Sequence, residues 1–181
     1  MPFRDDGSWE PRPLRIGVTG HRKLGDHPGV EAVVRDASRR LLGAMAEVGR
    51  LNGGGIEAWS ALAIGADTLF AEAALELELP LVGVVPFANY PRDFRGPERP
   101  IFDALLERCS RVVTLDRKRK TKHAYLEGGT CIVQSVDLLF AVWNGQPARA
   151  LGGTGDVVAY AERRGVPVVC VDPASAGSAP K

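Results

Sequence analysis

Short apolar runs alternate along most of this chain with longer segments whose apolar residues recur every three or four positions. Runs of the first kind are typical of strands buried in a sheet. They fall at residues 14–18, 56–60, 81–85, 112–115, 137–143 and 166–171. Segments of the second kind, typical of helices, fall at residues 28–48, 67–77, 101–109, 124–135 and 156–164. This alternation predicts an α/β fold, a Rossmann-like three-layer α/β/α sandwich with a mostly parallel sheet.

The length of 181 residues suits a single domain, which we place at residues 13–172. Residues 1–12 contain proline and glycine without a periodic pattern, so we expect a flexible amino-terminal arm. Residues 173–181 are mostly alanine, serine, glycine and proline, which predicts a flexible tail. Residues 87–100 form a long irregular segment inside the domain, and loops of this length are often functional.

The charge balance gives the molecule no overall attraction to nucleic acid or to an anionic membrane. Twenty-three Lys and Arg residues against twenty-two Asp and Glu residues leave a net charge of +1. The three cysteines form no CxxC pair, and we expect neither a metal site nor a cofactor. No apolar run approaches the roughly 20 residues that span a bilayer, and the amino terminus has no signal-peptide pattern. We therefore expect a cytoplasmic protein without a membrane partner.

Ligands of parallel α/β sheets bind where the strands end at their carboxyl side. Here small, turn-forming residues occupy these ends after the first strand, after the second strand, and at residues 152–156 before the last helix. The candidate ligand-binding residues are Thr19, Gly20, His21, Arg22, Ser60, Gly65, Asp67, Trp143, Gly152, Gly153, Thr154, Gly155 and Asp156.

These turns favour a phosphate-bearing ligand. Glycine lets backbone N–H groups approach an anion closely, and the start of a helix carries a partial positive charge. Arg22 would add a fixed charge beside the phosphate, while Asp67 or Asp156 would accept a hydrogen bond from a ribose hydroxyl. Neither glycine turn has the GxGxxG or GK[ST] sequence, so a dinucleotide Rossmann site and a Walker loop are both disfavoured.

Each candidate also has a purely structural interpretation. The glycines are compatible with plain turns, and Asp67 with a helix cap. His21 suits either acid–base chemistry or a structural hydrogen bond. Trp143 suits either core packing or a surface on which a base stacks. The basic run at residues 117–122 suits either a nucleic-acid patch or a solvated loop.

The second turn, Ser60-Ala61-Leu62-Ala63-Ile64-Gly65-Ala66-Asp67, resembles the SGLAxGxD signature of the DNA-processing protein A family. The first turn, Thr19-Gly20-His21-Arg22, is similar to that family's GSR turn. Residues 137–145, with 152–158 and 165–168, resemble the GGT-containing half of the wider SLOG superfamily, which also includes the LOG nucleotide phosphoribohydrolases. The resemblance covers residues 14–171. It implies a Rossmann-like domain that binds a nucleotide or nucleotide-derived ligand at its glycine turns, commonly as a homodimer.

The chain departs from the motifs of both relatives. LOG enzymes carry a PGGxGTxxE motif whose glutamate is catalytic. Aligned on the two adjacent glycines, this chain has Leu151, Asp156 and Ala159 where that motif has proline, threonine and glutamate. A hydrolase of this type would use Asp156 or Glu162 instead. The arginine-rich helix of DNA-processing proteins is also replaced, here by residues 125–130.

The sequence leaves three functions open. The favoured one is a sensor or binding module that holds a nucleotide-like small molecule, such as a nucleoside monophosphate, ADP-ribose or an NAD-like ligand, at the carboxyl rim of the sheet. The second is an enzyme that hydrolyses the N-glycosidic bond of a nucleotide, as a phosphoribohydrolase does. The third is single-stranded DNA binding through residues 117–122, for which the net charge of +1 gives little support.

Overall fold

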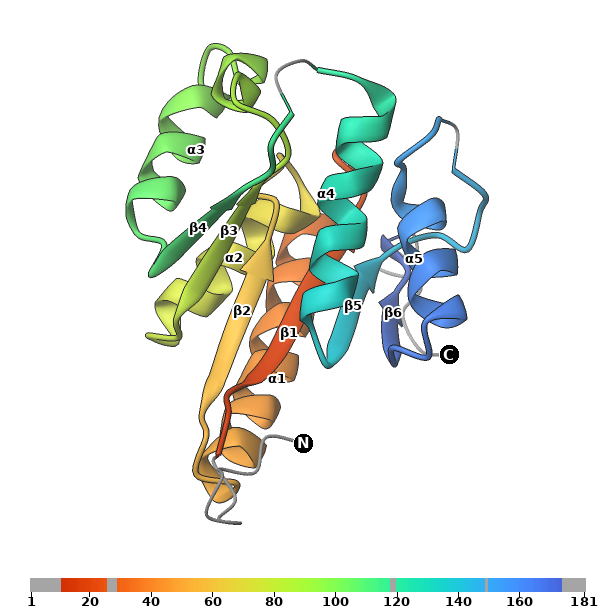
Figure 1. Cartoon of the computed structure of the whole chain (residues 1–181). Helices are drawn as coiled ribbons and strands as arrows, with labels where there is room; N and C mark the ends of the chain where they lie inside the picture. Colours follow the sequence, from red (N-terminus) through yellow and green to blue (C-terminus); the bar gives the residue numbers. More distant parts are fainter. Residues whose placement is uncertain (1–10, 26–28, 118–119, 149, 174–181) are drawn as a thin grey trace.

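The computed structural model describes residues 11–25, 29–117, 120–148 and 150–173, so most of the expected arm and tail lies outside the described residues. At its centre is a six-stranded sheet in the order β4-β3-β2-β1-β5-β6, in which all neighbouring strands run parallel (Figure 1). The strands are β1 (Leu14–Gly20), β2 (Ile56–Ser60), β3 (Leu81–Val85), β4 (Arg111–Thr114), β5 (Leu138–Val142) and β6 (Val168–Val171).

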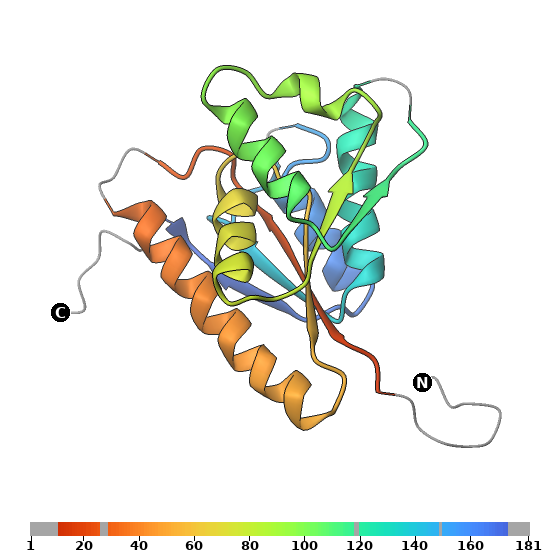
Figure 2. The ribbon, with the colours of Figure 1, turned by 90° about the vertical axis from the view of Figure 1, so that its left-hand side faces the viewer.

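Helices cover both faces of this sheet, as Figures 1 and 2 show. The helices α1, α2 and α3 lie on one face, and α4 and α5 lie on the other. Their bounds are α1 (Val30–Leu51), α2 (Ala66–Glu76), α3 (Glu98–Glu107), α4 (Lys122–Ser135) and α5 (Thr154–Arg163). The predicted three-layer α/β/α sandwich is therefore confirmed, and the mostly parallel sheet is parallel throughout.

The burial of the strands follows their positions in the sheet. Every residue of β3, an inner strand, is buried, whereas β4 at one edge is largely exposed. On α1 the buried residues Val30, Val34, Ser38 and Leu42 are spaced by four positions, so one stripe of the helix faces the sheet. Apolar residues at these positions are what hold each helix against its face of the sheet.

Glycines let α4 approach its neighbours closely. A Cβ atom added to Gly17 on β1 would lie 2.5 Å from Cγ2 of Ile132 on α4. A Cβ atom added to Gly129 on α4 would lie 2.5 Å from Cγ2 of Val157 on α5. Contacts that short do not occur between real side chains, so these two positions require glycine for the helix to pack as it does.

The irregular segment at residues 87–100 contains structure that the apolar pattern did not predict. A short 3-10 helix, η1 (Tyr90–Asp93), lies inside it, and α3 begins at Glu98 instead of residue 101. Pro100 lies in the first turn of α3, where a helix has no need of the backbone N–H that proline lacks. Among the described helices none is long and apolar enough to cross a membrane.

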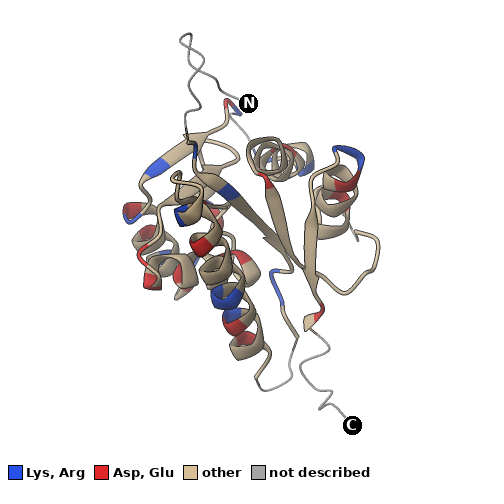
Figure 3. Cartoon of the chain, turned by 90° about the horizontal axis from the view of Figure 1, so that it is seen from below, with Lys and Arg blue, Asp and Glu red and all other residues tan. Residues whose placement is uncertain are grey.

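Acidic and basic residues are interspersed over the helices, as Figure 3 shows from the side where the strands begin. Between α1 and α2, for example, Arg35 binds Glu72 at 2.6 Å, and Arg39 pairs with Glu76. At the amino-terminal end of β1, the two outer nitrogens of Arg12 donate to the two carboxylate oxygens of Asp137 at 2.8 and 2.5 Å. Opposite charges therefore lie close together along these described elements.

Candidate functional site

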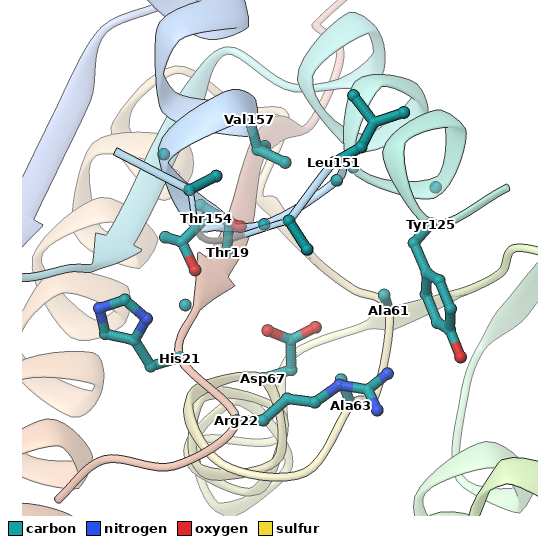
Figure 4. Close-up of a pocket in the computed structure, with 18 of the residues that line it drawn as sticks. Thr19, His21, Arg22, Ala61, Ala63, Asp67, Tyr125, Leu151, Thr154 and Val157 are labelled. Atoms are coloured by element: carbon teal, nitrogen blue, oxygen red, sulfur yellow. The ribbon is translucent and has the colours of Figure 1, made fainter. Parts of the chain in front are cut away.

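The strand order creates a crevice beside the carboxyl end of β1. From β1 the chain moves outward through β2, β3 and β4, then returns to the other side of β1 as β5. Connections therefore leave the ends of β1 and β5 toward opposite faces of the sheet, which opens a gap where ligands of α/β sheets bind. A cavity of about 710 Å³ lies at this point (Figure 4).

Nine of the thirteen candidate ligand-binding residues line the cavity. Residues from the turn after β1, from α2 and from the start of α5 thus come together although they are far apart in the sequence. These nine are Thr19, Gly20, His21, Arg22, Asp67, Gly152, Gly153, Thr154 and Gly155. The other four candidates, Ser60, Gly65, Trp143 and Asp156, are not among the lining residues, and their bonds within the protein explain why.

Ser60 and Gly65 shape the turn between β2 and α2 from behind the cavity wall. The Ser60 side chain is fully buried, accepts a hydrogen bond from the N–H of Leu62 at 3.0 Å and donates to the carbonyl of Asp67 at 3.2 Å. Gly65 has a φ of 93°, and an added Cβ would lie 2.5 Å from the carbonyl oxygen of His21. Both residues therefore serve the backbone of the turn, and the ligand contact expected of them stays a prediction.

Trp143 and Asp156 are likewise held by local backbone. Nε1 of Trp143 donates to the carbonyl of Gln146 at 2.7 Å, which fixes the indole against the loop that follows β5. The carboxylate of Asp156 accepts the N–H of Gly152 at 2.9 Å and so closes the glycine loop before α5. A side chain occupied in this way supports the loop from outside the cavity.

The start of α5 presents unpaired hydrogen-bond donors to the cavity. In the described part of the chain, no hydrogen bond within the protein uses the N–H of Thr154 or of Gly155. Both residues line the cavity, and the positive end of the α5 dipole lies at the same place. Two free N–H groups at a helix start form a site suited to phosphate.

A buried carboxylate, that of Asp67 in the first turn of α2, forms another part of the cavity wall. Its side chain points into the cavity beside Arg22 in Figure 4, and the residue is only 6% exposed. Burial raises the pKa of Asp67 to about 7, although hydrogen bonds from the backbone of Ala63 and Ala61 and the positive charge of Arg22 each act to lower it. This group therefore changes its charge near neutral pH.

Arg22 is the cation next to that carboxylate. Its side chain is exposed, forms no ion pair within the described residues, and lies 5.2 Å from the ring centre of Tyr125 on α4. His21 also lines the cavity, but its Nε2 atom is buried without a hydrogen-bond partner in the described structure and is therefore shielded from a ligand.

The lining also contains residues that sequence reasoning missed, above all Tyr90 and Tyr125. Tyr90 belongs to η1 and is fully buried at 1% exposure within a cluster of aromatic rings that includes Phe87 and Phe102. The hydroxyl of Tyr125 donates to the carboxylate of Asp93. For Tyr90 the available signal was the aromatic-rich irregular segment at residues 87–100, which the sequence marked only as a long loop; Tyr125 lies in the helix expected at residues 124–135.

Comparison with known proteins places the fold. No family model and no curated protein matches the sequence. Among solved structures, the chain is similar to the DNA processing protein A of Streptococcus pneumoniae, with a TM-score of 0.60 and 16% identity over 90% of this chain and 53% of that chain. It is also similar to the Helicobacter pylori protein of the same name, with a TM-score of 0.59 and 15% identity over 91% and 71%.

The molybdenum cofactor carrier protein of Chlamydomonas reinhardtii matches at a TM-score of 0.51 and 17% identity, over 88% of this chain and 76% of that chain. These likenesses show that the chain shares the Rossmann-like fold of the three proteins. The present chain spans about half the length of the Streptococcus protein, 53%. At identities of 15–17% these likenesses establish the fold alone and leave the ligand to be argued from the site.

The two acidic residues considered for hydrolysis lie outside the cavity lining. Asp156 closes the glycine loop, and Glu162 is exposed on α5. Ala159, at the position of the LOG glutamate, also lies outside the lining. Across the described ranges, no three His, Cys, Asp or Glu side chains are grouped in a way that would hold a metal ion.

Proposed function

We propose that this chain is a SLOG-type module that binds a nucleotide or nucleotide-derived ligand in the cavity between the ends of β1 and β5. One observation carries the proposal: the unpaired N–H groups of Thr154 and Gly155 face the same cavity as the unpaired cation of Arg22. Together they supply donors and charge for a phosphate. The volume of about 710 Å³ lies within the usual range of small-molecule sites.

The lining of this cavity suits the rest of such a ligand. Ala61, Ala63, Leu151 and Val157 provide apolar walls, and Tyr125 provides an aromatic ring beside them. A flat base is a group that such walls would hold, because it buries apolar surface and stacks against aromatic rings. The ligand is then held at one end by its phosphate and along its length by contact with these walls.

Binding without turnover fits the site better than hydrolysis. The carboxylate of Asp156 already holds the N–H of Gly152, and Glu162 is exposed outside the cavity lining. A general acid or nucleophile has to reach the bond that is cleaved, either directly or through one water. The two carboxylates considered for hydrolysis, Asp156 and Glu162, are not placed to do so, which supports a sensor or binding role.

Single-stranded DNA is supported less well as the ligand, although the Helicobacter protein is described by its mode of binding single-stranded DNA. Arg117, from the basic run, donates to both carboxylate oxygens of Glu127 at 2.6 and 2.5 Å. Lys120 binds Asp93 at 3.0 Å. Lys118 and Arg119 lie outside the described residues. Cations that already have acidic partners have less charge to offer to a nucleic-acid backbone.

The test is a thermal-shift and calorimetric screen of the full chain against AMP, ADP, ADP-ribose, NAD and inorganic phosphate. Binding to the native state raises its stability by RT ln(1 + [L]/Kd), so even weak ligands register. Each ligand that binds is then incubated with the protein, and free base is measured by chromatography. Binding without base release is the expected result, whereas base release would establish an enzyme.

The matched variants are Arg22→Ala in the cavity and Arg40→Ala on the exposed side of α1. Arg22→Ala removes a charge-assisted contact to phosphate, so we expect at least roughly tenfold weaker binding. The side chain of Arg40 is 80% exposed, and its ion pair among the described residues is with Asp36 on its own helix, so its loss should leave binding unchanged. Absence of a response to every nucleotide in the wild-type protein would refute the proposed function.

A further inference from the structure

Two polar groups on the cavity wall have no side-chain partner that satisfies them. In the described structure the carboxylate of Asp67 forms no hydrogen bond or ion pair with another side chain, and the hydroxyl of Tyr90 forms no hydrogen bond. Both residues are more than nine-tenths buried, at 6% and 1% exposure, and both line the cavity. The backbone of Ala63 and Ala61 hydrogen-bonds the Asp67 carboxylate, but a carboxylate has further lone pairs that can accept. Because buried polar groups are normally hydrogen-bonded, the remaining capacity of Asp67 and the unpaired Tyr90 hydroxyl point to a ligand.

The two helix starts at the cavity are electrostatically different. At α2 the N–H groups of Ala66 and Thr68 are already used by the carbonyls of His21 and Ala63, at 3.3 and 3.1 Å, and the carboxylate of Asp67 occupies the first turn. At α5 two N–H groups are free. A phosphate is therefore favoured at α5 and repelled at α2, where a neutral hydrogen-bond donor is favoured instead.

A hydroxyl group satisfies both residues at the α2 end. It can donate its hydrogen to the Asp67 carboxylate while its oxygen accepts from the Tyr90 hydroxyl. An amino group on a base can only donate, and would leave the Tyr90 hydroxyl without an acceptor. Two neighbouring hydroxyls, as on ribose, can engage both residues at once.

We infer that Asp67 and Tyr90 form a subsite for the vicinal hydroxyls of a phosphorylated ribose, so that the chain selects ribonucleotides over deoxyribonucleotides. This inference rests on the proposed function, because it assumes that the phosphate binds at the start of α5. Arg22 lies beside the subsite, where it balances the carboxylate and faces the same ligand. The group that this subsite would recognise is a ribose bearing a phosphate, and it occurs both in nucleotides and in sugar phosphates without a base.

Isothermal titration of the full chain with matched ligands tests the inference. The pairs are AMP against 2′-deoxy-AMP, and ribose 5-phosphate against 2-deoxyribose 5-phosphate, with inorganic phosphate as the common fragment. The first pair reports on a nucleotide and the second on a sugar phosphate alone. We expect each ribose ligand to bind roughly tenfold more tightly than its deoxy partner, since a lost hydrogen bond leaves a buried group unpaired.

Two conservative variants assign the selectivity to the named residues. Asp67→Asn keeps an acceptor for the turn but removes the charge, and Tyr90→Phe keeps the aromatic ring and removes only its hydroxyl. Each should bring the ribose and deoxyribose affinities together by weakening the ribose ligand. Asp103→Asn, exposed on α3, and Tyr160→Phe, whose hydroxyl binds Gln134 at 2.7 Å outside the cavity lining, are the matched controls.

The measurements distinguish failure of the hydroxyl subsite from failure of the proposed function. Equal affinity for ribose and deoxyribose ligands in the wild-type protein overturns the hydroxyl subsite and leaves the proposed function standing. Equal weakening of both ligands by Asp67→Asn and Tyr90→Phe shows a structural effect on the cavity and also overturns the subsite. Absence of binding by every phosphorylated ligand overturns the proposed function as well.

Discussion

Asp67 couples the stability of the fold to pH. Its folded-state pKa is about 7, against an ordinary value of 3.8. Between these values the folded state holds a proton that the unfolded state has released, so rising pH favours unfolding. The free energy of unfolding should therefore fall by up to about 1.4 kcal/mol for each pH unit across this window. Above the folded-state pKa both states are deprotonated and this contribution becomes constant.

Comparison with Asp67→Asn isolates this effect, because all other titrating groups cancel in the difference. Urea unfolding of both proteins at intervals between about pH 5 and pH 8 should show the asparagine variant gaining relative stability as pH rises, then levelling off. A difference in unfolding free energy that does not change with pH would contradict the raised pKa of this carboxyl.

The candidate residues could be predicted from the sequence where they belong to a local motif. Arg22 and Asp67 stand in the turns that follow β1 and β2, so the rule for parallel sheets is enough to place them at the rim. Tyr90 has no such signal, since it reaches the cavity from an irregular segment. Ser60 also stands in such a motif, but a structural task for its hydroxyl could not be predicted: it pairs the buried N–H of Leu62, and its contact with a ligand stays a prediction.

At the scale of elements, α4 packs closely against α5 because Gly129 on α4 has no side chain. The β-carbon of an alanine at position 129 would come within 2.5 Å of Val157, so Gly129→Ala should destabilise the fold by about 1–3 kcal/mol. Gly43 on α1 is the matched control, since an added Cβ meets nothing within 4 Å. Gly43→Ala should stabilise the protein by about 0.5–1 kcal/mol through helix propensity alone.

Urea denaturation midpoints of the two variants and the wild-type protein measure this contrast. The sign of the change should differ between the two positions, although the substitution and the type of element are the same. Destabilisation of similar size at both positions would mean that helix α4 does not pack against α5 as closely as described.

The apolar pattern predicted most elements, and their ends were the least accurate part. The strand β5 was expected at residues 137–143 and occupies Leu138–Val142. The helix α5 was expected from residue 156 but begins at Thr154, because Gly153 in extended conformation precedes the first helical residue. Polar and glycine residues at a helix start show no apolar periodicity. The apolar pattern therefore could not predict the first turn of α5.

At the scale of the whole molecule, the sequence predicts a parallel sheet but not the order of its strands. Alternating strands and helices are compatible with several orders, and only the pairing of β1 with both β2 and β5 sets the crevice between them. The pairing of β1 with β5 depends on contacts between residues more than a hundred positions apart, such as Gly20 beside Val142. The pattern of neighbouring residues in the sequence does not show which distant residues pair, so the exact site of the cavity could not be predicted.

The distribution of charge over the whole chain bears on the choice between a nucleotide and a nucleic acid. With a net charge of +1 and paired cations at Arg117 and Lys120, the surface offers few sites for successive backbone phosphates. We therefore expect a single-stranded oligonucleotide to bind no more tightly than about 1 µM, in the range of non-specific binding at physiological salt.

Fluorescence anisotropy with a labelled oligothymidine, repeated between about 50 and 200 mM salt, measures this expectation. A protein that releases many counterions loses affinity steeply over that range, whereas binding of a mononucleotide through one phosphate changes little. Tight oligonucleotide binding with a steep salt dependence, weakened by Arg117→Ala, outside the cavity lining, but not by Arg22→Ala, would place DNA on the basic run. Displacement of the oligonucleotide by AMP would instead place its terminal nucleotide in the cavity between β1 and β5, because only a ligand of the same site competes.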